Sequence, residues 1–219
     1  MPARLRPTAP IAADAILVGD PERALLLAQE LLEEPKMSNH ARGLWGYTGQ
    51  TASGQALSVQ ATGMGGPSAA LVLADLAELG VRRAIRVGTC TALDPELSPG
   101  QLLAIEEAHA WSGGGAGEAI LPDPGLSERL RHELGGRALP VTVASLDTLH
   151  GGGAPSPVAA GDAADMQTAA LFSRGRASGV ALAAVLIVAE AANGEQLGAE
   201  AGELAAKRAG IAASASLST

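Results

Sequence analysis

A short apolar run that stops at a glycine and a proline constrains the fold more than any other feature of the chain. Residues 15–18 read Ala-Ile-Leu-Val, and residues 19–23 read Gly-Asp-Pro-Glu-Arg. Such a run is typical of a buried strand, and residues 22–33 have the spacing of a helix. A strand that enters a helix through a glycine brings main-chain N–H groups and the positive end of the helix dipole toward an anion. The pattern predicts an α/β chain with an anion-binding turn at Gly19, where Arg23 offers phosphate a planar fork. An ordinary strand-to-helix turn with a surface arginine is the alternative.

Strands and helices alternate along the rest of the chain. We expect strands at residues 15–18, 44–47, 55–62, 84–87, 102–110, 141–145 and 183–189, and helices at 22–33, 69–79, 126–134, 165–173 and 200–213. The second and third strands form a hairpin, and glycine-rich loops occupy 63–68, 112–117 and 150–161. The alternation predicts an α/β fold with a single domain over residues 1–219, in which helices flank a mixed central β-sheet. Ligands of such sheets bind at the carboxyl ends of the strands.

The composition excludes several classes of function. A net charge of −8 and an aromatic content of 2% argue against a nucleic-acid partner, and no apolar stretch is long enough to cross a bilayer. The single cysteine, Cys90, permits no intramolecular disulfide, and the N-terminus carries no signal core, so we expect a cytoplasmic protein. The histidines and Cys90 lack metal-ligand spacing, and no dinucleotide-binding or Walker motif is present. We expect no metal, no cofactor, no nucleic acid and no membrane partner.

Arg86 is a second candidate for anion binding, because it lies inside the apolar strand predicted at 84–87. A buried arginine without a partner is costly, so Arg86 needs either an acidic side chain or a bound anion. Thr89 adds a hydroxyl group and a main-chain N–H at the end of the strand. A structural pair between Arg86 and a carboxylate is the alternative to an anion site.

Four motifs stand in the order in which a known enzyme family has them. They are Gly-Asp-Pro-x-Arg at 19–23, Arg-Gly-Leu-x-Gly-Tyr-Thr-Gly at 42–49, Gly-Met-Gly-x-Pro-Ser at 63–68 and Arg-Val-Gly-Thr at 86–89. In these motifs the chain resembles the nucleoside phosphorylase family that includes hexameric bacterial purine nucleoside phosphorylase and uridine phosphorylase. The resemblance implies a single-domain phosphorylase/hydrolase-like fold. It also implies a homo-oligomer, a dimer or a trimer of dimers, whose active sites borrow residues from a neighbouring subunit.

The resemblance also implies the substrates and the roles of individual residues. The substrates would be a nucleoside and orthophosphate, with no cofactor. Phosphate would be bound by Gly19, Arg23, Arg86, Thr89 and, from the adjacent subunit, Arg42. The ribose would contact Met64, Met166 and Gln167, and the base would contact Cys90, Thr91, Leu149, His150 and Glu190. The catalytic residues would be Arg86, which helps to hold the phosphate in line, and Glu190, which protonates the leaving base. These residue types suit an oxocarbenium-like transition state, in which positioning and charge stabilisation lower the barrier.

The chain departs from the family pattern in its second half. Residues 165–167 read Asp-Met-Gln where the family has Glu-Met-Glu. Gln167 therefore offers the ribose no negative charge, which predicts a loss of rate of roughly ten- to a hundredfold. Glu190 stands where the purine enzymes of the family have an aspartate, and an ordinary carboxylate at the start of a helix is the alternative interpretation.

Two further departures affect the base and the subunit interface. Leu149 or His150 replaces the aromatic residue that stacks on the base, and Ala3 or Arg4 replaces the histidine that family members lend across the dimer. Three hypotheses remain: an active nucleoside phosphorylase that favours purine over uridine nucleosides, an impaired paralogue that binds phosphate or a nucleoside, and a nucleosidase of the same fold. The three arginines argue against the nucleosidase, because water needs no cationic clamp.

Overall fold

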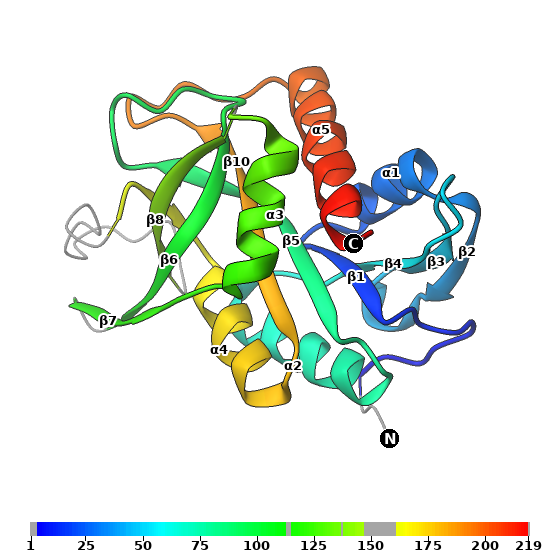
Figure 1. Cartoon of the computed structure of the whole chain (residues 1–219). Helices are drawn as coiled ribbons and strands as arrows, with labels where there is room; N and C mark the ends of the chain where they lie inside the picture. Colours follow the sequence, from blue (N-terminus) through cyan, green and yellow to red (C-terminus); the bar gives the residue numbers. More distant parts are fainter. Residues whose placement is uncertain (1–3, 113–114, 137, 147–160, 219) are drawn as a thin grey trace.

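The computed structural model describes residues 4–112, 115–136, 138–146 and 161–218, so the predicted base-binding residues Leu149 and His150 lie outside the described part. Figure 1 shows a β-sheet through the middle of the molecule with helices on both sides. The strands are β1 (Asp14–Val18), β2 (Glu33–Asn39), β3 (Gly46–Gln50), β4 (Ala56–Ala61), β5 (Arg83–Ala92), β6 (Leu102–Ser112), β7 (Gly115–Ile120), β8 (Ala138–Leu146), β9 (Ala163–Asp165) and β10 (Ala181–Glu190). The helices are α1 (Pro21–Leu31), α2 (Gly65–Glu78), α3 (Pro124–Leu134), α4 (Thr168–Ser178) and α5 (Ala199–Leu217). The expected mixed α/β fold is confirmed.

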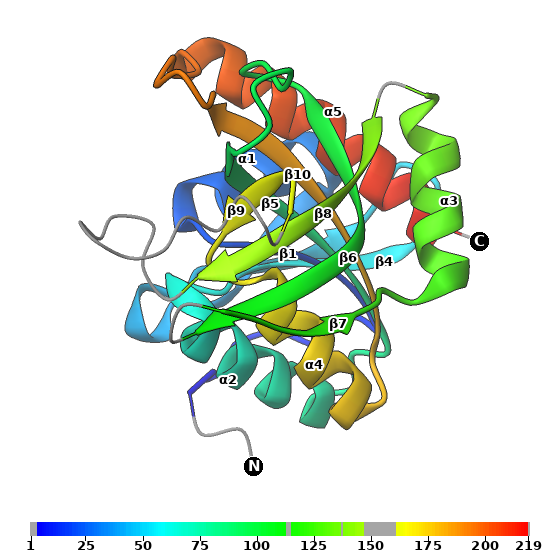
Figure 2. The same ribbon diagram turned by 90° about the vertical axis from the view of Figure 1, so that its left-hand side faces the viewer.

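The sheet consists of a closed ring and an open wing that share β5. In the ring, β5 pairs in parallel with β10, which pairs antiparallel with β6. The ring continues through parallel pairs β6–β8 and β8–β9, and β9 returns antiparallel to β5. In the wing, β1 lies parallel to both β5 and β4, and the antiparallel strands β3 and β2 follow. Figures 1 and 2 show the ring on one side of the molecule and the wing on the other.

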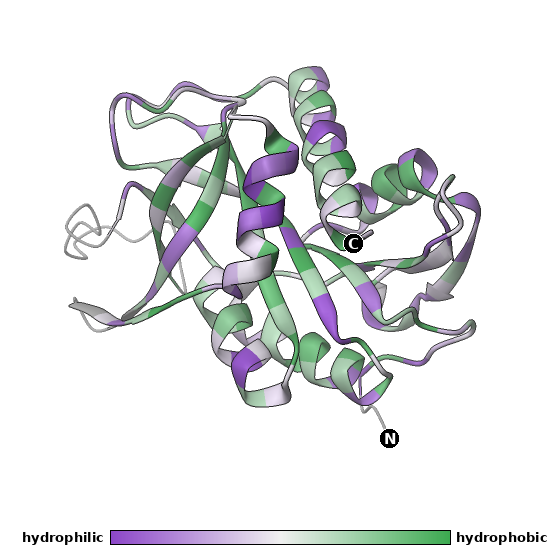
Figure 3. Cartoon of the chain, in the orientation of Figure 1, coloured by the Kyte–Doolittle hydropathy of each residue, from purple (hydrophilic) through white to green (hydrophobic). Residues whose placement is uncertain are grey.

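The apolar core occupies both faces of the sheet. Because side chains alternate along a strand, β10 contributes to both faces. Leu186 and Val188 belong to the cluster under α2 and α4, and Val185 and Ile187 belong to the cluster under α1, α3 and α5. Figure 3 shows hydrophilic residues on the outward side of α3, as expected for a helix that packs one face on a sheet. The two layers of helices leave the strand ends open for a ligand site.

Three strands, β2, β7 and the short β9, were not predicted from the sequence. The helix expected at 22–33 ends at Leu31, because Leu32 is already extended, with φ −113° and ψ 136°. The strand β2 then follows, and its charged, mostly exposed residues show no apolar alternation. The glycine-rich loop expected at 112–117 was also wrong, since it contains the end of β6 and the start of β7, which pair as a hairpin.

Several predicted boundaries were also wrong. The strand expected at 44–47 begins at Gly46, because the preceding residues form a 3-10 turn in which Arg42 has a left-handed φ of 61°. The helix expected at 165–173 begins at Thr168, since the preceding residues include the last residue of β9. The strand expected at 84–87 continues to Ala92 and therefore contains the whole glycine-threonine-cysteine segment that was expected to follow it.

Candidate functional site

A cavity of about 570 Å³ lies at the ends of β1 and β4, beside the middle of β5, the start of α2 and the segment before α4. Its position agrees with the expectation that ligands bind at the carboxyl ends of parallel strands. The residues that line it are Gly19, Asp20, Pro21, Arg23, Gly63, Met64, Gly65, Arg86, Gly88, Thr89, Met166 and Gln167. The structure therefore brings together seven predicted site residues from four distant parts of the sequence: Gly19, Arg23, Met64, Arg86, Thr89, Met166 and Gln167.

The turn after β1 is built as a helix start that faces this cavity. Asp20 caps α1, because its Oδ1 accepts a hydrogen bond of 2.8 Å from the Glu22 main-chain N–H, and Pro21 occupies the first helical position. The cap fixes the first turn of α1, which carries Arg23. The predicted strand-turn-helix geometry is therefore present, with Arg23 directed along the strand ends.

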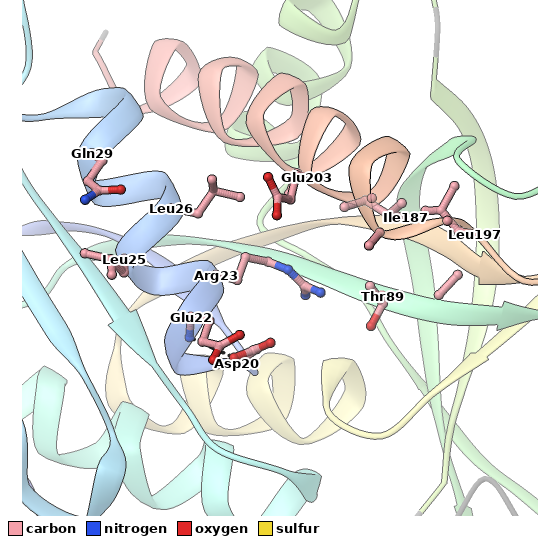
Figure 4. A pocket seen from close by; sticks show the side chains of 15 residues that line it. Asp20, Glu22, Arg23, Leu25, Leu26, Gln29, Thr89, Ile187, Leu197 and Glu203 are labelled. Atoms are coloured by element: carbon pink, nitrogen blue, oxygen red, sulfur yellow. Dashed lines mark hydrogen bonds between the residues drawn. The ribbon is translucent and has the colours of Figure 1, made fainter.

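Arg23 is a partly buried cation that forms no hydrogen bond or ion pair with any residue of the described segments. Burial lowers the pKa of the Arg23 guanidinium; nearby Asp20 partly offsets this shift, and the positive charge of Arg86 adds to it. Figure 4 shows the Arg23 side chain reaching from α1 toward Thr89 on β5. The positive charge of Arg86 thus disfavours the charged form of Arg23, and an anion bound in this cavity would stabilise the Arg23 guanidinium.

Arg86 has the acidic partner that one interpretation of the sequence required. Its Nη2 donates to Asp165 Oδ2 at 3.0 Å, its Nη1 donates to Gln167 Oε1 at 2.6 Å, and its Nε donates to Thr168 Oγ1 at 3.1 Å. The ion pair is buried, since the side chains of Arg86 and Asp165 are 5% and 0% exposed. Gly88 makes room for this arrangement, because a Cβ there would lie 2.6 Å from the Arg86 guanidinium carbon. Arg86 thus combines a structural pair with a place in the cavity wall.

Gln167 lies at the cavity, where the ribose contact was predicted, but its amide is already engaged. Its Oε1 accepts from Arg86 and, at 3.1 Å, from the Thr62 hydroxyl, while its Nε2 donates to Gly63 O at 2.6 Å. The opposite amide orientation would set an NH₂ against Arg86 and an oxygen against a carbonyl. The amide therefore ties the glycine loop before α2 to Arg86. The single proton of the Thr62 hydroxyl also faces Val18 O at 2.9 Å, so Arg86 is the only unshared donor to Oε1 among the described residues.

Asp165 is the central acceptor of the site, and the sequence analysis gave it no role. Besides Arg86, it accepts from Ser145 Oγ at 2.5 Å and from Thr168 Oγ1 at 2.6 Å. The signal that could have identified it was the arginine inside an apolar strand, which demands a carboxylate from another element. Asp165 stands beside Met166 and Gln167 in the matched motif, but nothing in the sequence distinguished it from the other carboxylates as the partner of Arg86.

The described residues that were predicted to contact the base do not line the cavity: they are Cys90, Thr91 and Glu190. Cys90 is 3% exposed, its Sγ donates to Ile187 O at 3.6 Å, and burial raises the pKa of its thiol well above the usual range. Thr91 pairs with Glu190, the last residue of β10, and neither is among the residues that line the cavity. Glu190 does not start a helix, since α5 begins at Ala199, so that interpretation was wrong.

Two arginines from the N-terminal half lie outside the cavity. Arg42 is exposed in the turn before β3 and is not among the lining residues. Arg4, at the place of the family's N-terminal histidine, is tied to α2: its Nη1 lies 3.2 Å from Asp75 Oδ1, and its main-chain N–H donates to Asp75 Oδ2 at 2.6 Å. Arg4 is therefore committed to its own subunit.

A second cavity, of about 450 Å³, adjoins the first between α1 and α5. The two cavities share Asp20, Arg23 and Thr89, and Glu203 of α5 lines only the second. In Figure 4, Glu203 projects from α5 above the Arg23 side chain. Arg23 is thus accessible from both sides.

Within the described residues, no group of three or more His, Cys, Asp or Glu side chains is arranged to hold a metal ion. Nor does any described helix have the length and hydropathy needed to cross a membrane.

Comparison with known proteins gives the same family as the four motifs. A family model described as the phosphorylase superfamily matches residues 14–218. The chain is 42% identical over 99 residues to a purine nucleoside phosphorylase DeoD-type of Oceanobacillus iheyensis, a match that covers 45% of this chain and 42% of that protein. A protein of the same name from Levilactobacillus brevis is 37% identical over 130 residues, which cover 56% of this chain and 55% of the relative. The matched segments thus span about half of these relatives.

The fold has a close counterpart among solved structures. The purine nucleoside phosphorylase of Toxoplasma gondii in complex with immucillin-H superposes with a TM-score of 0.84 at 23% identity, and covers 94% of this chain and 92% of that chain. At this identity the likeness concerns the fold. Because the family model matches residues 14–218, and because the motif order and the mixed sheet agree with it, this chain belongs to the phosphorylase superfamily, in the nucleoside phosphorylase family.

Proposed function

We propose that the chain is a nucleoside phosphorylase that uses orthophosphate to cleave the N-glycosidic bond of a nucleoside, with purine favoured over uridine, and that it releases the free base and a pentose 1-phosphate. The observation that carries the proposal is the pair of guanidinium groups at one cavity. Arg23 forms no ion pair within the described residues; burial and Arg86 lower its pKa, and nearby Asp20 only partly offsets the shift. A phosphate dianion would supply the missing charge.

In the proposed mechanism the protein acts by holding phosphate and nucleoside in line. Arg23, Thr89 and the main chain at Gly19 hold the phosphate, while Arg86 adds positive charge from the cavity wall. A phosphate oxygen forms a bond to the anomeric carbon as the bond from that carbon to the base nitrogen breaks, and the bonding electrons leave with the base. Asp165 already fixes the Arg86 guanidinium, and the cap at Asp20 fixes the main chain of the helix turn that carries Arg23, so this framework needs little reorganisation in the transition state.

The leaving base needs a proton, and Glu190 is the proposed donor. Glu190 ends β10 opposite Thr91, and the register of β5 places Thr91 two residues beyond Thr89 of the cavity wall. A base that extends from the cavity along the end of β5 would approach this carboxyl group. Met64 and Met166 would pack on the sugar between the two ends.

We propose a homo-oligomer, a dimer or a trimer of dimers, in which Arg42 of one copy completes the phosphate site of another. Arg42 is exposed and lies outside its own cavity, so it is free to serve a neighbour. Three arginines would then surround one phosphate.

An impaired paralogue that binds phosphate or a nucleoside is the second candidate function, and the engaged amide of Gln167 favours it. Its Oε1 accepts from the charged Arg86 and its Nε2 donates to Gly63 O, so the amide is already committed to protein groups at the position where the ribose hydroxyls would need a carboxylate.

Turnover assays separate the candidates. The purified protein is incubated with inosine, adenosine or uridine, with and without phosphate, and the free base and pentose 1-phosphate are measured. Phosphate-dependent release of both products supports the proposed function. Base release that is independent of phosphate indicates a nucleosidase. The absence of turnover across purine and pyrimidine nucleosides, with phosphate binding retained in calorimetry, indicates the impaired paralogue.

A further inference from the structure

The turn that carries Arg42 is held in an unusual backbone conformation. Arg42 has φ 61° and Gly43 has φ 70°, so two successive residues are left-handed at the tip between β2 and β3 (Figure 1). A non-glycine residue adopts this conformation only where its surroundings impose it. The contacts of the turn therefore show which groups hold the Arg42 backbone in this conformation.

Two buried amide side chains from different strands meet on one carbonyl group directly after the turn. Asn39, which is 0% exposed at the end of β2, donates from Nδ2 to Leu44 O at 2.5 Å and to Ala41 O at 3.3 Å. Gln60 of β4, which is 1% exposed, donates from Nε2 to the same Leu44 O at 3.0 Å. Both ends of the turn are thus fixed by side chains that solvent cannot reach.

The placement of Gln60 costs the protein stability. Its Oε1 and the Ser38 Oγ are buried and form no hydrogen bond within the described residues. A Cβ at Gly46 would lie 2.2 Å from Gln60 Oε1, so the chain keeps a glycine there. A buried acceptor without a donor is unfavourable, and an apolar side chain of the same size would avoid the loss. The donor side of the amide, which holds the turn, gives a reason for a glutamine at this position.

We propose that Asn39 and Gln60 are positioning residues, which hold the turn so that Arg42 is ready to meet a phosphate bound by a second copy of the chain. The inference rests on the proposed function, in which Arg42 completes a neighbour's site. A turn that is ordered before binding loses less conformational entropy when the arginine engages the anion. Without the two amides, the Arg42 backbone would relax toward right-handed conformations.

A double-mutant cycle tests whether Gln60 acts through Arg42. Gln60→Met keeps the length of the side chain and removes the donor. The matched control is Gln55→Met, since the Gln55 amide also donates to a main-chain carbonyl, Leu217 O at 2.7 Å, away from the turn. We expect Gln60→Met to raise KM for phosphate about two- to tenfold, the effect of one lost hydrogen bond. KM for the nucleoside should stay constant, and Gln55→Met should leave KM for phosphate unchanged.

In an Arg42→Ala background, Gln60→Met should have no further effect on KM for phosphate. An equal increase in both backgrounds, or no increase in either, would overturn the proposal, because a general loss of structure does not depend on Arg42.

Hydrogen exchange of the turn tests the inference independently of enzyme activity. The Gly43 and Leu44 amides donate to His40 O at 3.3 Å and to Ala41 O at 3.1 Å. We expect both amides to exchange at least threefold faster in Gln60→Met than in the wild type and in Gln55→Met. Equal rates in the two variants would overturn the proposal. If the wild type cleaves no nucleoside, the proposed function fails, and exchange alone then decides whether the amides hold the turn. Asn39→Ser takes the place of Gln60→Met in both tests if that variant does not fold.

Discussion

Replacing Asp165 by asparagine tests the charge balance of the candidate site. The substitution keeps the shape of the side chain and removes the charge that faces Arg86 across 3.0 Å. Breaking a buried ion pair by removing one partner leaves an uncompensated charge and costs about 3–5 kcal/mol. For a chain of this size we expect the melting temperature to fall by roughly 6–20 °C.

Phosphate should restore part of this stability, because an anion in the cavity would provide the missing charge. We expect a larger rise in melting temperature on adding phosphate to Asp165→Asn than to the wild type, measured by differential scanning calorimetry at constant ionic strength with sulfate-free buffer. Asp14→Asn is the control, since the carboxylate of Asp14 pairs with Arg83 at 2.8 Å away from the cavity. Two results would refute the reasoning: a loss below about 1 kcal/mol, or an equal phosphate effect in both variants.

Three further predictions follow from the same contacts. Arg23→Gln should leave the free energy of unfolding in urea within about 0.5 kcal/mol of the wild type, because Arg23 forms no hydrogen bond or ion pair in the described residues. The same substitution should abolish the stabilisation by phosphate. Retained stabilisation would contradict the proposed role of Arg23 in phosphate binding. Gly88→Ala should destabilise the protein by about 1–3 kcal/mol in urea, because its Cβ would lie 2.6 Å from Arg86 and 2.7 Å from Leu186, whereas Gly198→Ala, whose Cβ meets nothing within 4 Å, should have little effect. Burial raises the pKa of Cys90 in the folded state, so the unfolded thiol ionises first and stability falls as pH rises through the ordinary thiol pKa of 9.0. The slope approaches about 1.4 kcal/mol per pH unit above that pH, and Cys90→Ala should remove this part of the slope in urea titrations between pH 9 and 10.

Local sequence signals identified the N-terminal residues that line the cavity. The strand at 15–18 and the helix start after it depend on neighbouring residues, so the turn carrying Arg23 could be recognised from an apolar run, a cap and a proline. The same holds for the glycine loop that carries Met64. The cavity then assembled from these pieces as the carboxyl-end rule for parallel strands predicts.

Contacts between segments that are far apart in the sequence could not be predicted from the sequence pattern. Arg86 and Asp165 are 79 positions apart, and β9, which delivers Asp165, has only three residues. The engagement of the Gln167 amide also depends on the closure of the ring, which brings β9 beside β5. A motif reports which residue types are available, whereas the partners of each hydrogen bond are fixed by tertiary packing.

The charged residues of β2 bear on the solubility of the folded protein. β2 lies at the end of the wing and pairs only with β3 among the described strands, so one row of its main-chain groups has no sheet partner there. Glu33, Glu34 and Lys36 are exposed along it, and Pro35 interrupts its donors. Charges and a proline on an outer strand discourage a second chain from adding itself to the sheet. The charges and the proline remove the apolar alternation by which a strand is recognised in a sequence. The same residues protect the molecule from edge-to-edge aggregation.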